Sequence, residues 1–82
     1  MTQQELFEKL SKIIAEFIDV EPSAVNGWKN LVEDFGCDSL DRIEIIMAVE
    51  EEFKIEIDDS ECEKIYKVDD LYHSVAKRVG VE

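Results

Sequence analysis

The chain has 82 residues, and its 21 acidic against nine basic side chains give a net charge of −12. A domain of this size buries one small core, and a hydrophobic content of 45% is sufficient for a globular fold. The charge excludes nucleic acids and anionic membranes as partners and favours proteins with basic docking patches. We therefore expect a single domain over residues 1–82 that is monomeric, binds proteins and has no stable membrane association.

The first predicted helix begins after Thr2, which forms with Glu5 the Thr-x-x-Glu pattern of a capping box. Apolar residues then recur at three- and four-residue spacing as far as Ile18, which is typical of an amphipathic helix. Pro22 ends this helix and starts a short turn through Val25. The first residues contain no basic segment followed by an apolar one, so we expect no signal peptide and a cytoplasmic location.

A long connection follows between residues 19 and 37 and shows no helical or strand periodicity. Apolar side chains have to attach a connection of this length to the rest of the domain. The sequence predicts the following anchors: Trp28, Leu31, Val32 and Phe35.

The second predicted helix covers residues 39–53 and starts shortly after Gly36, which allows a sharp backbone turn. Asp38 is a suitable N-cap, and Asp41 stands at the position of its capping-box partner. The pattern presents the Ser39 hydroxyl at a helix N-terminus, where a phosphate group is electrostatically favoured.

This second helix carries more apolar residues than one core-facing stripe needs. At about 100° per residue, the core side contains Ile45, Ile46, Val49 and Phe53. An adjacent face mixes apolar and acidic residues, namely Leu40, Ile43, Glu44, Met47, Glu50 and Glu51. In one interpretation Ile43 and Met47 only widen the core stripe, and the helical pattern alone supports both interpretations equally. Because the mixed face begins beside Ser39, we interpret it as a protein-binding surface.

The remaining sequence predicts two further helices. Asp58 and Asp59 are suited to cap a short third helix over about 60–64. A fourth begins at the acidic pair 69–70 and ends at Gly80. No convincing strand is found, so the predicted fold is an all-α four-helix bundle with three longer helices and a short third helix.

Independent catalysis does not fit these residues. Ser39 lies in no nucleophile-elbow pattern, and the single histidine, His73, lies among ordinary amphipathic positions. Acidic neighbours should raise the pKa of the Cys37 thiol and oppose its activation. Cys37 and Cys62 have no metal-ligand spacing, and the acids form no calcium-loop pattern, so we expect free thiols and no metal site.

The stretch from Glu33 to Asp41, Glu-Asp-Phe-Gly-Cys-Asp-Ser-Leu-Asp, resembles the approach to the phosphopantetheine attachment motif of acyl carrier proteins, and Asp38-Ser39-Leu40 resembles the motif itself. Residues 43–53 resemble the second helix of that family almost throughout, and looser similarity continues through residues 55–57 and 65–71. The resemblance thus covers essentially the whole chain and agrees with its size and charge.

The resemblance implies that the protein is no enzyme but a substrate of a phosphopantetheinyl transferase, which attaches 4′-phosphopantetheine from coenzyme A to Ser39. The arm would carry acyl groups as thioesters between fatty acid synthesis enzymes. Partners would contact the following residues: Asp38, Leu40, Asp41, Ile43, Glu44, Met47, Glu50 and Glu51. Candidates for lining an acyl pocket inside the bundle are Ile46, Val49, Phe53, Ile57, Cys62, Ile65 and Leu71.

Three residues depart from the family pattern. Cys37 stands where alanine is common, Trp28 is unusual in the loop, and Arg42 adds a positive charge that should partly offset the acidic docking face. These departures leave open a dedicated carrier of aminoacyl, D-alanyl or polyketide units, which would keep Ser39 and load a different group. A third hypothesis is an unmodified interaction module that retains the fold.

Overall fold

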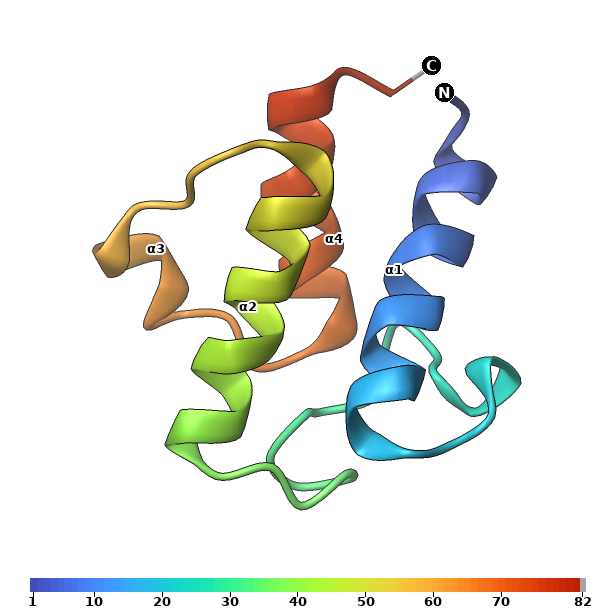
Figure 1. Cartoon of the computed structure of the whole chain (residues 1–82), viewed down its shortest axis with the longest axis vertical. Coiled ribbons are helices and arrows are strands. Elements are labelled where there is room, and N and C mark those ends of the chain that lie inside the picture. The colour runs from blue at the N-terminus through green and yellow to red at the C-terminus, as the bar shows by residue number, and fades with distance from the viewer. Residues whose placement is uncertain (82) are drawn as a thin grey trace.

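The computed structural model describes residues 1–81, which form helices joined by loops, with one isolated backbone bridge between Asn30 and Lys67. The elements are α1 (Gln3–Ile18), a short 3-10 helix η1 (Pro22–Ala24), α2 (Ser39–Phe53), α3 (Asp59–Cys62) and α4 (Val68–Val79). α1, α2 and α4 pack against one another, and the short α3 lies next to α2 (Figure 1). The predicted all-α architecture with a short third helix is confirmed.

The start of α1 and the end of α4 are fixed by the caps that the sequence predicts, whereas α1 and α2 end at Asp19 and Lys54 in left-handed conformations that the sequence analysis did not predict. The Thr2 hydroxyl accepts a hydrogen bond from the Glu5 amide at 3.2 Å, and the Glu5 carboxylate accepts one from the Thr2 amide at 3.0 Å. At the other end of the chain, Gly80 ends α4 with a φ of 71°, a conformation that costs glycine little.

The two C-terminal helices differ from their predicted bounds. α3 covers Asp59–Cys62, so it starts one residue earlier than predicted and is shorter, and Asp58 stands at its N-cap without a side-chain capping bond. α4 starts at Val68. The reason is that the Asp70 carboxylate reaches back and accepts hydrogen bonds from the amides of Lys67 at 2.9 Å and Tyr66 at 3.2 Å.

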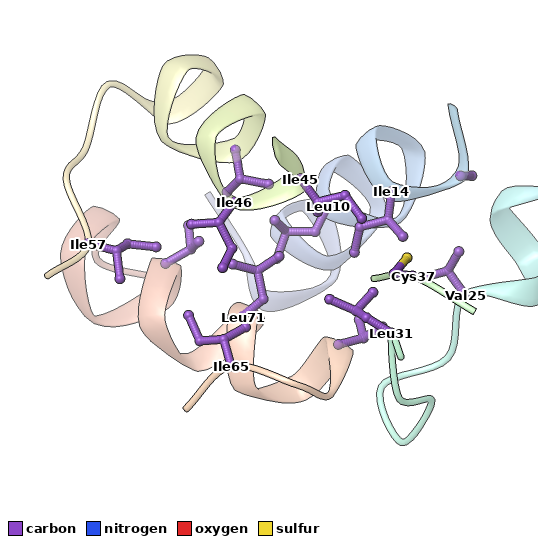
Figure 2. Packing of buried hydrophobic residues seen from close by; sticks show 14 of the residues in the cluster. Leu10, Ile14, Val25, Leu31, Cys37, Ile45, Ile46, Ile57, Ile65 and Leu71 are labelled. Carbon is purple, nitrogen blue, oxygen red and sulfur yellow. The ribbon is translucent and has the colours of Figure 1, made fainter. Parts of the chain in front are cut away.

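The core lies between α1, α2 and α4 and is built from aliphatic side chains (Figure 2). Its fully buried members include Leu6, Leu10, Ile14, Ile45, Val49, Leu71 and Val75. Ile46 is also buried and Phe53 is half-buried, which confirms the core side predicted for the second helix. The core thus fixes α2 along its whole length and leaves its opposite side outward.

The long connection is anchored differently from the prediction. Leu31 is fully buried and Phe35 is half-buried, as expected. Trp28 and Val32 are 65% and 38% exposed, so their prediction as anchors was wrong. Buried Cys37, which Figure 2 shows within the core cluster, is an additional anchor close to the start of α2.

Backbone hydrogen bonds supply the rest of the attachment. The Leu31 amide donates to the Tyr66 carbonyl at 2.7 Å, and the Val68 amide donates to the Lys29 carbonyl at 3.0 Å. The Asp69 amide donates to the Gly27 carbonyl at 2.9 Å, at a place where a Cβ on residue 27 would come within 2.1 Å of the Asp69 carboxylate. Because the connection is held by the start of α4, it needs fewer buried side chains than its length suggests.

Within residues 1–81, no helix combines the length and the apolar character that a membrane span requires.

Candidate functional site

Ser39 is the first residue of α2, and it is exposed at the end of the helix that lies away from the two chain ends (Figure 1). The Asp38 carboxylate accepts a hydrogen bond from the Asp41 amide at 2.8 Å, and the Asp41 carboxylate accepts one from the Asp38 amide at 3.2 Å. Gly36 turns the chain ahead of this cap with a φ of 71°. The predicted capping box is confirmed, and it holds the serine hydroxyl at the positive end of the helix dipole.

No catalytic arrangement surrounds this hydroxyl. Among residues 1–81, no side chain hydrogen bonds to Ser39, and no group of three metal-ligating side chains occurs. His73 is exposed on α4, where its ring packs edge-on against Tyr72. Burial, and next the nearby carboxylates of Asp41 and Asp38, raise the pKa of the Cys37 thiol, in the direction that the sequence predicts. The site presents a hydroxyl to which no side chain of residues 1–81 is hydrogen bonded, so none is positioned to accept its proton.

The apolar residues predicted on the outer face of α2 are exposed. Leu40, Ile43 and Met47 are 62%, 46% and 59% exposed, and we call these three with the exposed Glu44 and Glu51 the outer face of α2. Large apolar side chains are rarely left in water in such a cluster without a partner. The interpretation that Ile43 and Met47 merely widen the core stripe is therefore wrong.

Three of the acids predicted for docking lie close to this face in different settings. Asp38 is exposed, and Asp41 is half-buried in the cap that the two residues form. Glu50 is half-buried because its carboxylate accepts a hydrogen bond from the Ile57 amide at 2.7 Å. Glu50 thus fastens the loop after α2, while Glu44 and Glu51 project outward.

Arg42 does not contribute its charge to the outer face. Its side chain turns inward, and its Nη1 donates to the carbonyl oxygens of Cys62 at 2.6 Å and Ile65 at 3.0 Å. The sequence analysis expected the positive charge of Arg42 to offset the acidic docking face. This expectation was wrong, because the guanidinium lies inside the protein. The sequence contained the signal, because residue 42 precedes the buried residues 45, 46 and 49 by three, four and seven positions and so shares their helix face.

A cavity of about 410 Å³ opens between α2 and α3. It is lined by Arg42, Ile43, Ile46, Met47, Glu50, Ile57, Asp59, Cys62 and Glu63. Three of the predicted pocket residues border it: Ile46, Ile57 and Cys62. The other four do not, since Val49, Ile65 and Leu71 are buried in the core and Phe53 packs half-buried against it. Two residues of the outer face, Ile43 and Met47, also line this cavity.

The α3 wall of this cavity is held to α4 by an ion-pair cluster around Glu61. Its carboxylate accepts hydrogen bonds from Arg78 Nη1 and Nη2, both at 3.0 Å, and from Lys77 Nζ at 3.2 Å. Arg78, Ser74 and Lys77 together lower the pKa of Glu61 to about 2. Arg78 also donates to the Glu56 carbonyl at 2.8 Å, so one guanidinium fixes both α3 and the loop before it.

The comparisons with known proteins agree with this geometry. The family model described as "Phosphopantetheine attachment site" matches residues 8–73. The chain is 42% identical to an acyl carrier protein of Thermosynechococcus vestitus, over 98% of this chain and 99% of that protein. It is 40% identical to one of Campylobacter concisus over 88% and 94% of the two chains, and 37% identical to one of Thermotoga maritima over 96% and 98%.

The small helical bundle and the family model that covers most of it together define a carrier domain with a phosphopantetheine attachment site. The chain belongs to the acyl carrier protein family, whose members are non-catalytic carriers. The residues present fit 4′-phosphopantetheine: an exposed hydroxyl stands among the free amides of a helix N-terminus, which favour a phosphate group.

Proposed function

We propose that this protein carries acyl intermediates of fatty acid synthesis as thioesters on a 4′-phosphopantetheine arm attached to Ser39. The observation that supports this most is the exposed position of Ser39 on the first residue of α2, beside an outer face of exposed apolar and acidic side chains. The arm supplies the thiol that bears the acyl group. Ser39 anchors the arm, and the capping box of Asp38 and Asp41 fixes the direction in which the arm leaves the helix.

The docking partners would be a phosphopantetheinyl transferase and acyl-processing enzymes with basic patches. Leu40, Ile43 and Met47 offer apolar area that a partner can bury, and Glu44 and Glu51 attract cationic side chains around it. The net charge of −12 would accelerate the encounter from a distance. We place this exchange in the cytoplasm, between a monomeric carrier and one enzyme at a time.

Between encounters, the acyl group would enter the cavity between α2 and α3. Ile46 and Ile57 offer apolar contact there, and the cavity opens next to the helix that bears Ser39. The chemical benefit is exclusion of water from the thioester and the hydrocarbon chain. Val49, Ile65 and Leu71 would take part only as the core behind this cavity.

A dedicated carrier of aminoacyl, D-alanyl or polyketide units is the second candidate. It is favoured by one observation, namely that four of the cavity residues are charged: Arg42, Glu50, Asp59 and Glu63. A carrier of aminoacyl or D-alanyl units is distinguished from a fatty acid carrier by loading the holo protein with a malonyl transferase and malonyl-coenzyme A, or with amino-acid-adenylating ligases and ATP. Fatty acid synthesis predicts malonyl transfer at a rate close to that of a fatty acid carrier used as reference. Aminoacylation without malonyl transfer would contradict it.

A further inference from the structure

Arg42 is a buried cation that forms no ion pair with any carboxylate of residues 1–81. It is only 9% exposed, although the chain carries 21 acidic residues. The two ion pairs found among residues 1–81 both involve Glu61 with α4. Burial of a charged group is unfavourable unless its hydrogen-bonding groups are satisfied. The N–H groups of Arg42 therefore depend on acceptors in the protein and, where these are missing, on water.

The protein satisfies only part of this guanidinium. Nη1 uses its hydrogens on the carbonyl oxygens of Cys62 and Ile65, and the ring of Tyr66 lies 4.7 Å from the guanidinium carbon. A guanidinium has five N–H donors, and within residues 1–81 no acceptor is found for Nε or Nη2. Neither Nε nor Nη2 is among the fully enclosed unpaired atoms, and Arg42 lines the cavity between α2 and α3. A ligand in this cavity can therefore compete with water for these donors.

The chemistry of the cavity limits which ligand suits those donors. Glu50, Asp59 and Glu63 line the same cavity, and they would repel a ligand that carries a carboxylate. A saturated acyl chain offers Arg42 only its thioester carbonyl, so it displaces water from Nε and Nη2 without replacing all of its hydrogen bonds. A neutral oxygen on an otherwise apolar chain avoids both costs, because it accepts a hydrogen bond and adds no charge.

The position of Arg42 indicates where on the chain this oxygen should lie. Among the α2 residues of the cavity, Arg42 is nearest in sequence to Ser39, and Glu50 lies about 12 Å further along the helix axis. A chain that enters from the Ser39 side would bring its thioester end past Arg42. Its hydrocarbon end would then lie against Ile46 and Ile57.

We propose that Arg42 makes this cavity select acyl chains that bear a neutral oxygen close to the thioester, such as 3-hydroxyacyl chains, over saturated chains of the same length. The inference rests on the proposed function, because the acyl group reaches the cavity only on an arm attached to Ser39. One additional hydrogen bond that contributes on the order of 1 kcal/mol, after the water it displaces is taken into account, corresponds to a preference of roughly five- to tenfold for the oxygenated chain.

The test measures how well the cavity shelters each chain. The holo protein is loaded with 3-hydroxyoctanoyl or octanoyl groups, and intact mass confirms each loading. The rate of thioester cleavage by hydroxylamine is then measured on the protein and, for the same acyl group, on free pantetheine. The protection is the rate on free pantetheine divided by the rate on the protein. We expect the wild-type protein to protect the 3-hydroxyoctanoyl thioester about five- to tenfold better than the octanoyl thioester. Equal protection of the two chains would overturn the proposal.

Arg42→Met retains the apolar stem and removes the donors, so the difference between the two chains should disappear. Arg42→Lys retains a cation and should retain part of the difference in protection between the two chains. Val75→Ala on α4 is the control for destabilisation, since Val75 is fully buried and does not line the cavity. It should retain the preference, and loss of the preference in Val75→Ala would show that stability and not Arg42 sets the protection.

If Arg42→Met fails to fold, a measurement on the wild-type protein alone tests the proposed role of Arg42. The Nε–H resonance of Arg42 in ¹⁵N-labelled protein should shift further on loading with 3-hydroxyoctanoyl than on loading with octanoyl. The same response to both chains, or no response, would contradict the proposal. Failure of the proposed function is distinguishable, because the Ser39 arm and its acyl group would then be missing from the intact mass.

Discussion

Replacement of Glu61 by glutamine tests the contact that holds the α3 wall of the cavity. In the native structure its carboxylate receives two parallel hydrogen bonds from Arg78, each 3.0 Å long, and one from Lys77. The side chains of Glu61 and Arg78 are 22% and 19% exposed, so water screens the pair only in part. Glu61→Gln keeps the size and shape of the side chain and removes its charge.

The magnitude follows from the pKa of Glu61, which its surroundings lower from 4.5 to about 2. This change in pKa corresponds to at most roughly 3 kcal/mol of stabilisation of the folded state. Because the pair is partly exposed, we expect Glu61→Gln to lower the free energy of unfolding by about 1 to 2 kcal/mol. Because the folded pKa lies below the unfolded value, the stabilisation is fully present above pH 4.5. It is lost as the pH falls from 4.5 toward 2.

The assay is urea unfolding, followed by circular dichroism at several pH values between neutral and 2. Glu52→Gln is the matched control, because Glu52 is exposed on α2 and forms none of the ion pairs found in residues 1–81. Both variants relieve one unit of the net negative charge, so their difference isolates the contact with Arg78. The reasoning is refuted if Glu61→Gln is as stable as Glu52→Gln at neutral pH, or if their difference persists undiminished at the lowest pH.

Three further outcomes are expected. Glu44→Lys on the outer face should lower the kcat/KM of a phosphopantetheinyl transferase by about tenfold at unchanged helix content, while the control Glu8→Lys on α1 should leave it unchanged. Equal effects of the two variants would show that the outer face of α2 is not the docking surface. Ionic strength of about 0.15 M should raise the Tm relative to very low salt by screening self-repulsion, and a constant Tm would show that repulsion is not limiting. Ile45→Ala in the core should cost about 2 to 5 kcal/mol, but Trp28→Ala should stay within about 0.5 kcal/mol, and a large loss there would contradict the exposed position of Trp28.

Local sequence signals predicted the elements and the anchor point because their causes are local. The Thr2 and Asp38 capping boxes each depend on residues three positions apart, and Gly80 has the conformation that ends a helix. The same applies to Ser39, whose place on α2 follows directly from the cap before it. Helical periodicity likewise separated the core side of α2 from its outer face.

Features that depend on contacts between residues far apart in the chain could not be predicted from the sequence. Trp28 stays exposed because backbone bonds to Tyr66, Val68 and Asp69 already hold the connection that contains it. The cavity could not be located because its α3 wall is placed by contacts far apart in the chain, from Arg42 to Cys62 and from Arg78 to Glu61. The inward turn of Arg42 is a different case, since its helix face was visible in the spacing and only its charge suggested an outward position.

The central claim is that Ser39 is the point to which the carrier arm is attached. Intact mass spectrometry after incubation with coenzyme A and a phosphopantetheinyl transferase tests it most directly, with Ser39→Ala and a known carrier in parallel. The wild-type chain should gain one phosphopantetheinyl group, and the variant should gain none although it remains folded by circular dichroism. The claim is contradicted if the wild-type chain stays unmodified while the known carrier is loaded, or if Ser39→Ala is loaded as well.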